Sequence, residues 1–163
     1  MKNILVLCTG NSCRSQIAHG WLNYYTDSSK IQIYSAGIEA HGLNKMAIET
    51  MSEIGIDISH QKSNLISDYD KIQFDFIITV CDNAKENCPV FHSKNSKKIH
   101  KNFSDPSKIN GDINKIKNSF KKTRDEIRDF CKNFVFENLI WKTIEPSQPE
   151  IFFLFFVLIF FCP

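Results

Sequence analysis

Residues 8–15, which read CTGNSCRS, constrain the fold more than any other part of this chain. Residues 2–7 before them form a short, mostly apolar run that is typical of a strand buried in a parallel sheet. After them, apolar residues recur at helical spacing, namely Ile17, Ala18, Trp21, Leu22 and Tyr25. Residues 8–15 are therefore predicted to form the turn from a strand into a helix.

A strand-to-helix turn of this kind is suited to binding a tetrahedral oxyanion. Its backbone N–H groups can point inward, the positive end of the helix dipole adds to them, and Gly10 relaxes the backbone. The same field and the Arg14 guanidinium favour the thiolate form of Cys8, which makes this sulfur a candidate nucleophile. The planar fork of Arg14 suits two oxygens of one anion. The alternative is a buried structural cysteine near a surface arginine.

The residues expected to contact the anion are those of the loop itself: Thr9, Gly10, Asn11, Ser12, Cys13, Arg14 and Ser15. Ser15 is also expected to donate to the sulfur of Cys8, and Cys13 to be a structural thiol near the helix start. The segment does not end in Gly-Lys-Ser/Thr, so it lacks the mark of a nucleotide-binding loop.

Strands and helices alternate along the rest of the chain. Strands are predicted at 31–35 and 74–80, and helices at 44–54 and 112–134, with Asn44 as an N-cap. This alternation predicts right-handed crossovers and an α/β fold whose parallel sheet is covered on both faces. Ligands of such sheets bind beyond the carboxyl ends of the strands.

Length and charge limit the function classes. With 163 residues the chain can bury one sizeable core, and its net charge is only +2. Residues 94–132 hold 12 Lys or Arg against 5 Asp or Glu, which raises the question of nucleic-acid binding. Those lysines interleave with the apolar residues of the predicted last helix, as on a solvated helix face, so no nucleic-acid partner is expected.

Six cysteines raise the question of a secreted, disulfide-rich protein. The chain is large enough to fold without disulfides, and its N-terminal apolar run is too short for a signal peptide. We therefore expect a reducing cytoplasmic compartment, where closely spaced cysteines are more often catalytic, redox-active or metal-binding than structural.

Five motifs occur in the order in which one known family carries them: residues 8–15, 34–37 and 56–59, Cys81 with Cys88, and Asp105 before a proline. In these motifs the chain resembles the thioredoxin-coupled arsenate reductases of the low-molecular-weight protein tyrosine phosphatase superfamily. The resemblance covers residues 1–134. It implies a three-layer α/β fold with a four-stranded parallel sheet, whose fourth strand lies at Lys97–His100. Residues 1–134 are then the expected catalytic domain, and residues 135–163 an atypical C-terminal extension.

The resemblance also implies a three-cysteine relay that reduces arsenate to arsenite. Cys8 attacks the arsenic atom while Arg14 holds the oxyanion and Asp105 protonates the departing oxygen. Cys81 then attacks the sulfur of Cys8, and arsenite leaves. Cys88 finally attacks that disulfide, which frees Cys8 and leaves Cys81 joined to Cys88 for reduction by thioredoxin. No cofactor is expected.

Other functions would use the same loop. A phosphatase acting on phosphotyrosine or small aryl phosphates would need Cys8, Arg14 and Asp105 equally. However, Ser107 and Lys108 stand where the related phosphatases usually carry aromatic residues. A non-catalytic oxyanion-binding module is a third hypothesis.

Local sequence alone favours simpler roles for the later residues. Cys81 would be a core residue at a strand end, Cys88 a loop thiol and Asp105 a turn or capping residue. The stretch between the two cysteines is expected to be a loop or a short helix that unwinds. Zinc held by Cys81, Cys88 and His92 would lack a fourth ligand, so no zinc site is predicted.

Some relatives bind a potassium ion beside the loop through Asn, Ser and two carboxylates. Here Asn11 and Ser35 match, but His19 and Asn64 stand where the carboxylates would be. A hard cation prefers charged oxygen ligands, so no potassium site is predicted.

The resemblance stops near residue 134. Residues 145–149 are typical of a linker, and residues 151–162 form an uninterrupted apolar run with six of the 14 phenylalanines. Twelve helical residues extend ~18 Å against a bilayer core of ~30 Å, so this run is not expected to span a membrane. Contact with a membrane surface, packing against the domain, and an addition without a selected role remain open alternatives.

Overall fold

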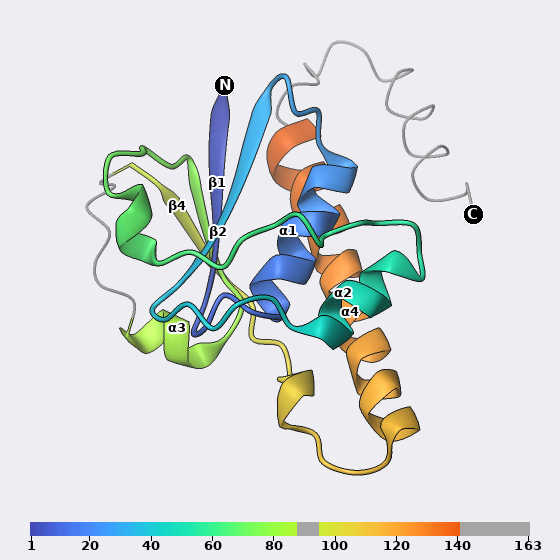
Figure 1. Ribbon diagram of the computed structural model, residues 1–163. Helices are drawn as coiled ribbons and strands as arrows, with labels where there is room; N and C mark the ends of the chain where they lie inside the picture. The colour runs from blue at the N-terminus through green and yellow to red at the C-terminus, as the bar shows by residue number, and fades with distance from the viewer. Residues whose placement is uncertain (88–94, 141–163) are drawn as a thin grey trace, which may run out of the picture. The chain divides into compact units, whose positions relative to one another are not determined.

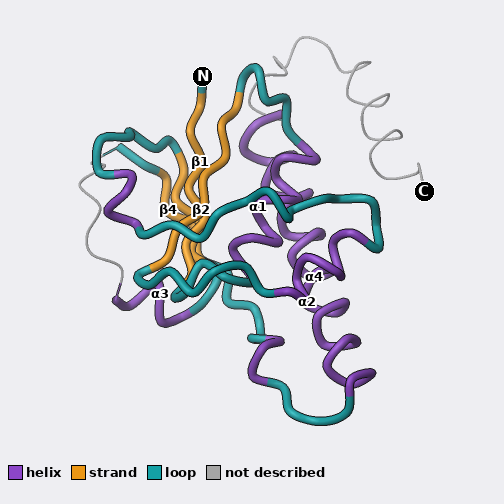
Figure 2. Tube along the Cα trace, viewed as in Figure 1, coloured by secondary structure: helices purple, strands orange, loops and turns teal. Residues whose placement is uncertain are grey.

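Four parallel strands form the centre of the protein in its computed structural model, which describes residues 1–87 and 95–140 (Figures 1 and 2). The strands are β1 (Lys2–Cys8), β2 (Ile31–Gly37), β3 (Phe76–Thr79) and β4 (Lys97–His100). They are hydrogen-bonded in the order β2-β1-β3-β4, and every pairing is parallel. The predicted α/β fold with a four-stranded parallel sheet is therefore confirmed, including its fourth strand.

Helices cover the sheet on both faces. The helical segments are α1 (Arg14–Tyr25), α2 (Lys45–Ser52), η1 (Ile66–Tyr69), α3 (Asp82–Asn87), η2 (Pro106–Lys108), α4 (Ile113–Val135) and η3 (Phe136–Ile140). Figure 1 shows α1 and α4 on one side of the sheet and η1 on the other. Trp21 of α1 donates its Nε1–H to the carbonyl oxygen of Arg124 in α4 at 3.2 Å, which ties these two helices together.

Most predicted element boundaries agree with the structure to within a few residues. Asn44 caps α2 as predicted, because its Oδ1 accepts from the N–H groups of Met46 and Ala47 at 2.9 and 3.2 Å. β3 is shorter than the predicted 74–80, and α2 ends before the predicted residue 54. Phe74 and Val80 are buried but lie outside the assigned strand, although the Val80 N–H still donates to the carbonyl oxygen of Leu7 at 2.9 Å. Burial therefore extended the apolar pattern beyond the strand.

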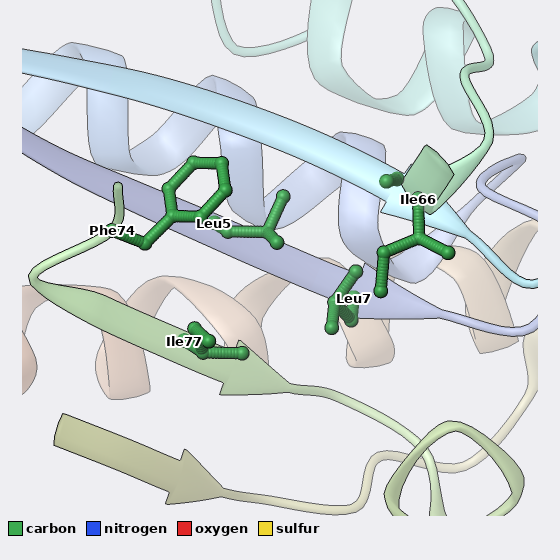
Figure 3. Close-up of a cluster of buried hydrophobic side chains, with 6 residues drawn as sticks. Leu5, Leu7, Ile66, Phe74 and Ile77 are labelled. Atoms are coloured by element: carbon green, nitrogen blue, oxygen red, sulfur yellow. The ribbon is translucent and has the colours of Figure 1, made fainter. Parts of the chain in front are cut away.

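Alternating residues of β1 supply both faces of the sheet. Leu5 and Leu7 pack with Ile66, Phe74 and other apolar residues in one cluster (Figure 3). Ile4 and Val6 point to the opposite face and are 0% exposed. Because apolar side chains are buried on both sides of β1, this strand is fixed in place and so is Cys8 at its carboxyl end.

The described residues fall into two compact units, Met1–Lys132 and a second that starts at Asn133. In the second unit, Asn138 Nδ2 donates to the carbonyl oxygen of Phe134 at 3.0 Å. No helix in the described part of the chain has the length and apolar character needed to cross a membrane. The apolar run at 151–162 lies outside the described residues, as do Cys88 and His92.

Candidate active site

The loop between β1 and α1 turns its carbonyl groups outward. The carbonyl oxygens of residues 9–13 each accept a hydrogen bond of 2.8 to 3.0 Å from outside the run. The donors are the backbone N–H groups of Glu39, His41, Asn44 and Ile17 and the side chain of Gln16. The C=O of one residue and the N–H of the next point in opposite directions across a planar peptide unit. The N–H groups of residues 10–14 therefore face the inside of the loop, where they form a concave row of donors.

Gly10 has a packing role that the sequence did not indicate. Asn11, not Gly10, takes the left-handed backbone conformation of the loop, with φ of +43°. Gly10 is needed instead for close packing, because a Cβ atom there would lie 2.4 Å from His41 Nδ1. The glycine thus lets the His41 segment approach the loop and bond to its carbonyl groups.

Cys8 is held by a chain of directed hydrogen bonds. Its Sγ lies 3.0 Å from Ser15 Oγ, and that oxygen accepts from Asn11 Nδ2 at 2.9 Å. Asn11 Oδ1 in turn accepts from the backbone N–H of Asn64 at 2.8 Å. Because the Ser15 oxygen already accepts from Asn11, the Ser15 O–H is available to donate to the sulfur of Cys8.

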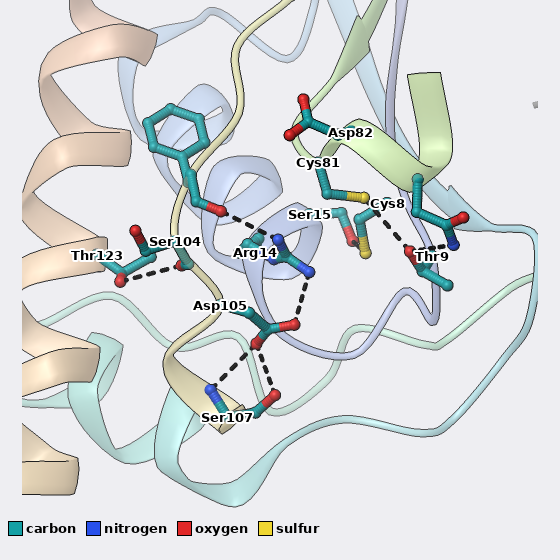
Figure 4. A network of polar contacts seen from close by, with 12 residues as sticks. Cys8, Thr9, Arg14, Ser15, Cys81, Asp82, Ser104, Asp105, Ser107 and Thr123 are labelled. Atoms are coloured by element: carbon teal, nitrogen blue, oxygen red, sulfur yellow. Dashed lines mark hydrogen bonds and ion pairs between the residues drawn. The ribbon is translucent and has the colours of Figure 1, made fainter. Parts of the chain in front are cut away.

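Arg14 and Asp105 are joined directly. Arg14 Nη2 lies 2.7 Å from Asp105 Oδ2, and Arg14 Nη1 donates to the carbonyl oxygen of Phe103 at 3.0 Å (Figure 4). The other Asp105 oxygen, Oδ1, accepts from the N–H and the hydroxyl of Ser107 at 3.1 and 2.6 Å. Asp105 therefore caps η2, as local sequence suggested, and also reaches Arg14.

Cys81 lies beside the same loop although it is far from Cys8 in sequence. Cys81 Sγ is 3.4 Å from Thr9 Oγ1, and Asn83 Nδ2 donates to that oxygen at 3.0 Å. Cys8 and Cys81 line the same cavity, and Figure 4 shows the Cys81 sulfur directed toward Thr9 and the Cys8 sulfur directed toward Ser15. The structure thus brings together two of the three cysteines of the expected relay, and the third, Cys88, is outside the described residues.

One cavity of about 630 Å³ connects these groups, and Cys8, Arg14, Cys81 and Asp105 all line it. Of the loop residues expected to contact an anion, Thr9, Gly10, Ser12 and Cys13 also line it. Asn11 and Ser15 do not: both are 0% exposed, Ser15 contacts Cys8, and Asn11 contacts Ser15.

Sequence analysis missed several residues that line this cavity. They are His41, Asp82, Asn83, Asn102, Phe103 and Ser104. Asn83 follows Cys81 by two residues, and this short separation could have indicated that Asn83 also contacts Thr9. The others come from loops whose paths the sequence pattern does not fix. Among the described lining residues, Phe103 is the one Phe, Tyr or Trp.

Two buried cysteines are kept as neutral thiols. Burial raises the pKa of Cys13, and the nearby charges of Asp105 and Cys8 raise it further. Burial likewise raises the pKa of Cys131, whose sulfur lies 3.8 Å from the carbonyl oxygen of Ala18. Neither thiol has the thiolate character of a nucleophile.

The residues at the potassium position do not suit that ion. His19 Nδ1 lies 3.1 Å from Ser35 Oγ, and burial, with a smaller effect of His60, lowers the pKa of His19 to about 4. The Asn64 side chain donates to the carbonyl oxygen of Lys62 at 3.1 Å. A neutral imidazole and an amide thus stand where a hard cation would need carboxylates.

Residues 3–145 match the family model described as low molecular weight phosphotyrosine protein phosphatase. Arsenate reductase 2 of Staphylococcus haemolyticus is 45% identical over 133 residues, which cover 82% of this chain and 95% of that protein. The arsenate reductase of Bacillus subtilis is 43% identical over 133 residues, with 82% and 94% covered.

Solved structures agree with the fold. A structure described as an arsenate reductase in oxidized state has a TM-score of 0.70 and 27% identity, over 84% of this chain and 98% of that one. The tyrosine phosphatase amsI of Erwinia amylovora has a TM-score of 0.68 and 18% identity, over 83% and 91% of the two chains. At 18% identity, the similarity to this phosphatase concerns the fold alone.

Proposed function

The chain belongs to the low molecular weight phosphotyrosine protein phosphatase family, and we propose that within this family it reduces arsenate to arsenite in arsenic detoxification. The observation that carries the proposal is the position of Cys81, whose sulfur contacts Thr9 next to the nucleophile Cys8. Hydrolysis of a phosphate ester needs no second thiol there. The 43–45% identity to arsenate reductases over most of the chain supports the same activity.

The first step forms a bond between Cys8 and arsenic. The N–H row of the loop and the Arg14 guanidinium bind the oxyanion, and the Cys8 thiolate attacks the As(V) atom. One arsenic–oxygen bond breaks as the sulfur–arsenic bond forms. Asp105 protonates the departing oxygen, which leaves as water.

The second step transfers electrons to arsenic. The Cys81 thiolate attacks the sulfur of Cys8, so that a disulfide forms while the sulfur–arsenic bond breaks. The bonding electron pair stays on arsenic, which leaves as arsenite in the As(III) state. Thr9 Oγ1 lies 3.4 Å from Cys81 Sγ and accepts from Asn83, so its O–H is available to donate to a Cys81 thiolate, which supports this role.

The third step returns Cys8 to its starting form. Cys88 attacks the sulfur of Cys81, the Cys8–Cys81 bond breaks, and the thiols of thioredoxin then reduce the Cys81–Cys88 disulfide. A seven-residue separation spans ~10 Å in a helix, which is too far for a disulfide, so α3 has to unwind in this step. The relay starts from free thiols and therefore belongs in a reducing compartment such as the cytoplasm.

The catalytic domain is proposed to be residues 1–134. Every described residue with a role in the relay lies in the unit Met1–Lys132, which supports this boundary.

The alternative of a phosphotyrosine phosphatase is less favoured by the cavity. Ser107 and Lys108 line it, and Phe103 is the one aromatic side chain among its described lining residues, so no pair of aromatic rings is present there to sandwich a phenyl ring. Small inorganic oxyanions fit such a polar cavity better than aryl esters.

The test is turnover of arsenate with thioredoxin, thioredoxin reductase and NADPH. Wild-type protein should consume NADPH only when arsenate is present, and Cys88→Ser should reduce this rate to the background. Cys131→Ser, which alters a buried cysteine remote from the relay, is the matched control and should remain active. Fast aryl phosphate hydrolysis that is indifferent to loss of both Cys81 and Cys88 would replace our proposal with the phosphatase.

A further inference from the structure

A polar cluster connects the first residue of α3 to the end of β4. Asp82 Oδ1 accepts from His100 Nε2 at 3.0 Å, and Asp82 Oδ2 accepts from Asn102 Nδ2. We call Asp82, His100 and Asn102 the α3 clasp. Figure 4 shows the Asp82 carboxylate directed away from the sulfur of Cys8. Asp82 follows Cys81 directly, so whatever holds its side chain also limits the movement of Cys81.

The His100 ring is fixed from both sides. Its Nδ1 lies 2.8 Å from the Thr79 hydroxyl oxygen, and its Nε2 faces Asp82. A neutral imidazole satisfies both contacts when it accepts from Thr79 and donates to Asp82. The ring is therefore a rigid link between the ends of β3 and β4 and the start of α3.

Asn83, the residue after Asp82, is held by a different part of the domain. Asn83 donates to Thr9 in the Cys8 loop, and the Thr9 hydroxyl contacts the Cys81 sulfur. Successive residues of α3 are thus bonded to different parts of the domain, Asp82 to β4 and the loop after it, and Asn83 to the Cys8 loop. Together they position Cys81 beside Cys8.

The clasp also has an electrostatic consequence for the cavity. Asp82 lines a space that is expected to hold an oxyanion, and a carboxylate there repels an anion. The donors of His100 and Asn102 bind both carboxylate oxygens and direct them away from the loop. The acidic residue is in this way made compatible with an anion site.

We propose that the α3 clasp positions Cys81 for attack on Cys8 and favours the dithiol form of Cys81 and Cys88 over their disulfide. The inference rests on the proposed function, since it concerns the disulfide that ends the relay. Forming that disulfide removes two protons and two electrons from the thiols and requires α3 to unwind. Contacts that hold the first turn of α3 stabilise the reduced form only, so their loss makes the disulfide easier to form.

The test measures the equilibrium between thiols and disulfide without arsenate. The full chain is equilibrated with mixtures of reduced and oxidised dithiothreitol, acid-quenched, and scored for the Cys81–Cys88 disulfide by peptide mass spectrometry. Asn102→Ala and His100→Leu should each raise the equilibrium constant for disulfide formation about fivefold. His100→Gln keeps a donor and should stay closer to wild type. Exposed Asn118 on α4 provides the matched control, and Asn118→Ala should change nothing.

The outcomes separate this inference from the proposed function. If wild-type protein forms no Cys81–Cys88 disulfide at any ratio, the relay itself is wrong. If the disulfide forms but Asn102→Ala and His100→Leu leave its equilibrium unchanged, the relay stands and the clasp is overturned. An Asp82→Ala background supplies a further check, because Asn102→Ala should then have no additional effect.

Discussion

Arg14 Nη2 lies 2.7 Å from Asp105 Oδ2, so the group proposed to hold the anion and the group proposed to protonate it are bonded to each other. Their side chains are only 12% and 19% exposed. An oxyanion that takes two donors of the guanidinium must share Arg14 with Asp105. Binding and protonation are therefore coupled through one ion pair.

Asp105→Asn should separate these two roles. The amide keeps the size of the side chain but cannot deliver a proton, so arsenate turnover should fall about 100-fold or more. Phosphate, an oxyanion that thiols do not reduce, should bind no more weakly than to wild type, because Arg14 loses a competing carboxylate. Steady-state kinetics and calorimetric titration with phosphate measure the two effects. Unchanged turnover would show that Asp105 is not the acid.

Ser15→Ala should slow the reaction of Cys8 with iodoacetamide at neutral pH by about tenfold. The substitution removes the hydroxyl that lies 3.0 Å from the sulfur, and with it a donor that favours the thiolate. Peptide mapping after timed alkylation measures the rate at each cysteine. Cys131 is the internal control: burial raises its pKa, so it should stay unmodified in the folded protein. An unchanged Cys8 rate would contradict the proposed hydrogen-bond chain.

Stability should fall as the pH is lowered from about 6.5 to about 4. Burial lowers the pKa of His19 to about 4, so over this range the unfolded chain binds a proton at His19 that the folded protein excludes. The free energy of unfolding should therefore decrease by up to about 3 kcal/mol across this window. Urea unfolding at several pH values measures it, and His19→Gln should flatten the dependence.

Asp27 and Asp57 act outside that window. Hydrogen bonds from Ser29 and Ser59 lower the pKa values of Asp27 and Asp57, so the stability that these carboxylates contribute is lost only at more acidic pH. If the free energy of unfolding of His19→Gln depends on pH as that of the wild type does, another group causes the effect.

Potassium should have no specific effect on this protein. The thermal midpoint and the arsenate turnover should be the same in KCl and NaCl at equal ionic strength, because His19 and Asn64 supply no carboxylate. The double variant His19→Glu with Asn64→Asp restores two charged oxygen ligands. Its thermal midpoint should rise by roughly 2 to 4 °C in KCl relative to NaCl. A potassium effect on the wild type would show that neutral donors suffice.

The sequence was most informative where local chemistry and periodicity agree. The strand-to-helix turn at residues 8–15 and the N-cap Asn44 follow from short-range rules, and both are found in the structure. The resemblance added the fourth strand, which Lys97–His100 indicates only weakly on its own. The packing role of Gly10 was missed, because its close contact with His41 depends on tertiary packing.

Contacts between distant loops could not be read from the pattern. The Thr9–Cys81 contact joins residues 72 apart, and the Asp82–His100 contact depends on how β4 aligns beside β3. Strand register is set by the whole sheet rather than by any one segment. Sequence reasoning therefore identified the candidate nucleophiles and Ser15 beside Cys8, but not the side chains from distant loops that contact Cys81 and Asp82.

The outward-facing carbonyls of residues 9–13 have one further consequence. The segments that bond to these carbonyl groups fix the shape of the loop before an anion binds. The loop therefore recognises an anion by its tetrahedral geometry and negative charge. Phosphate satisfies both criteria as well as arsenate does, so we expect it to compete with arsenate for the loop. Discrimination then falls to redox chemistry, because thiols reduce As(V) to As(III) but do not reduce the phosphorus of phosphate.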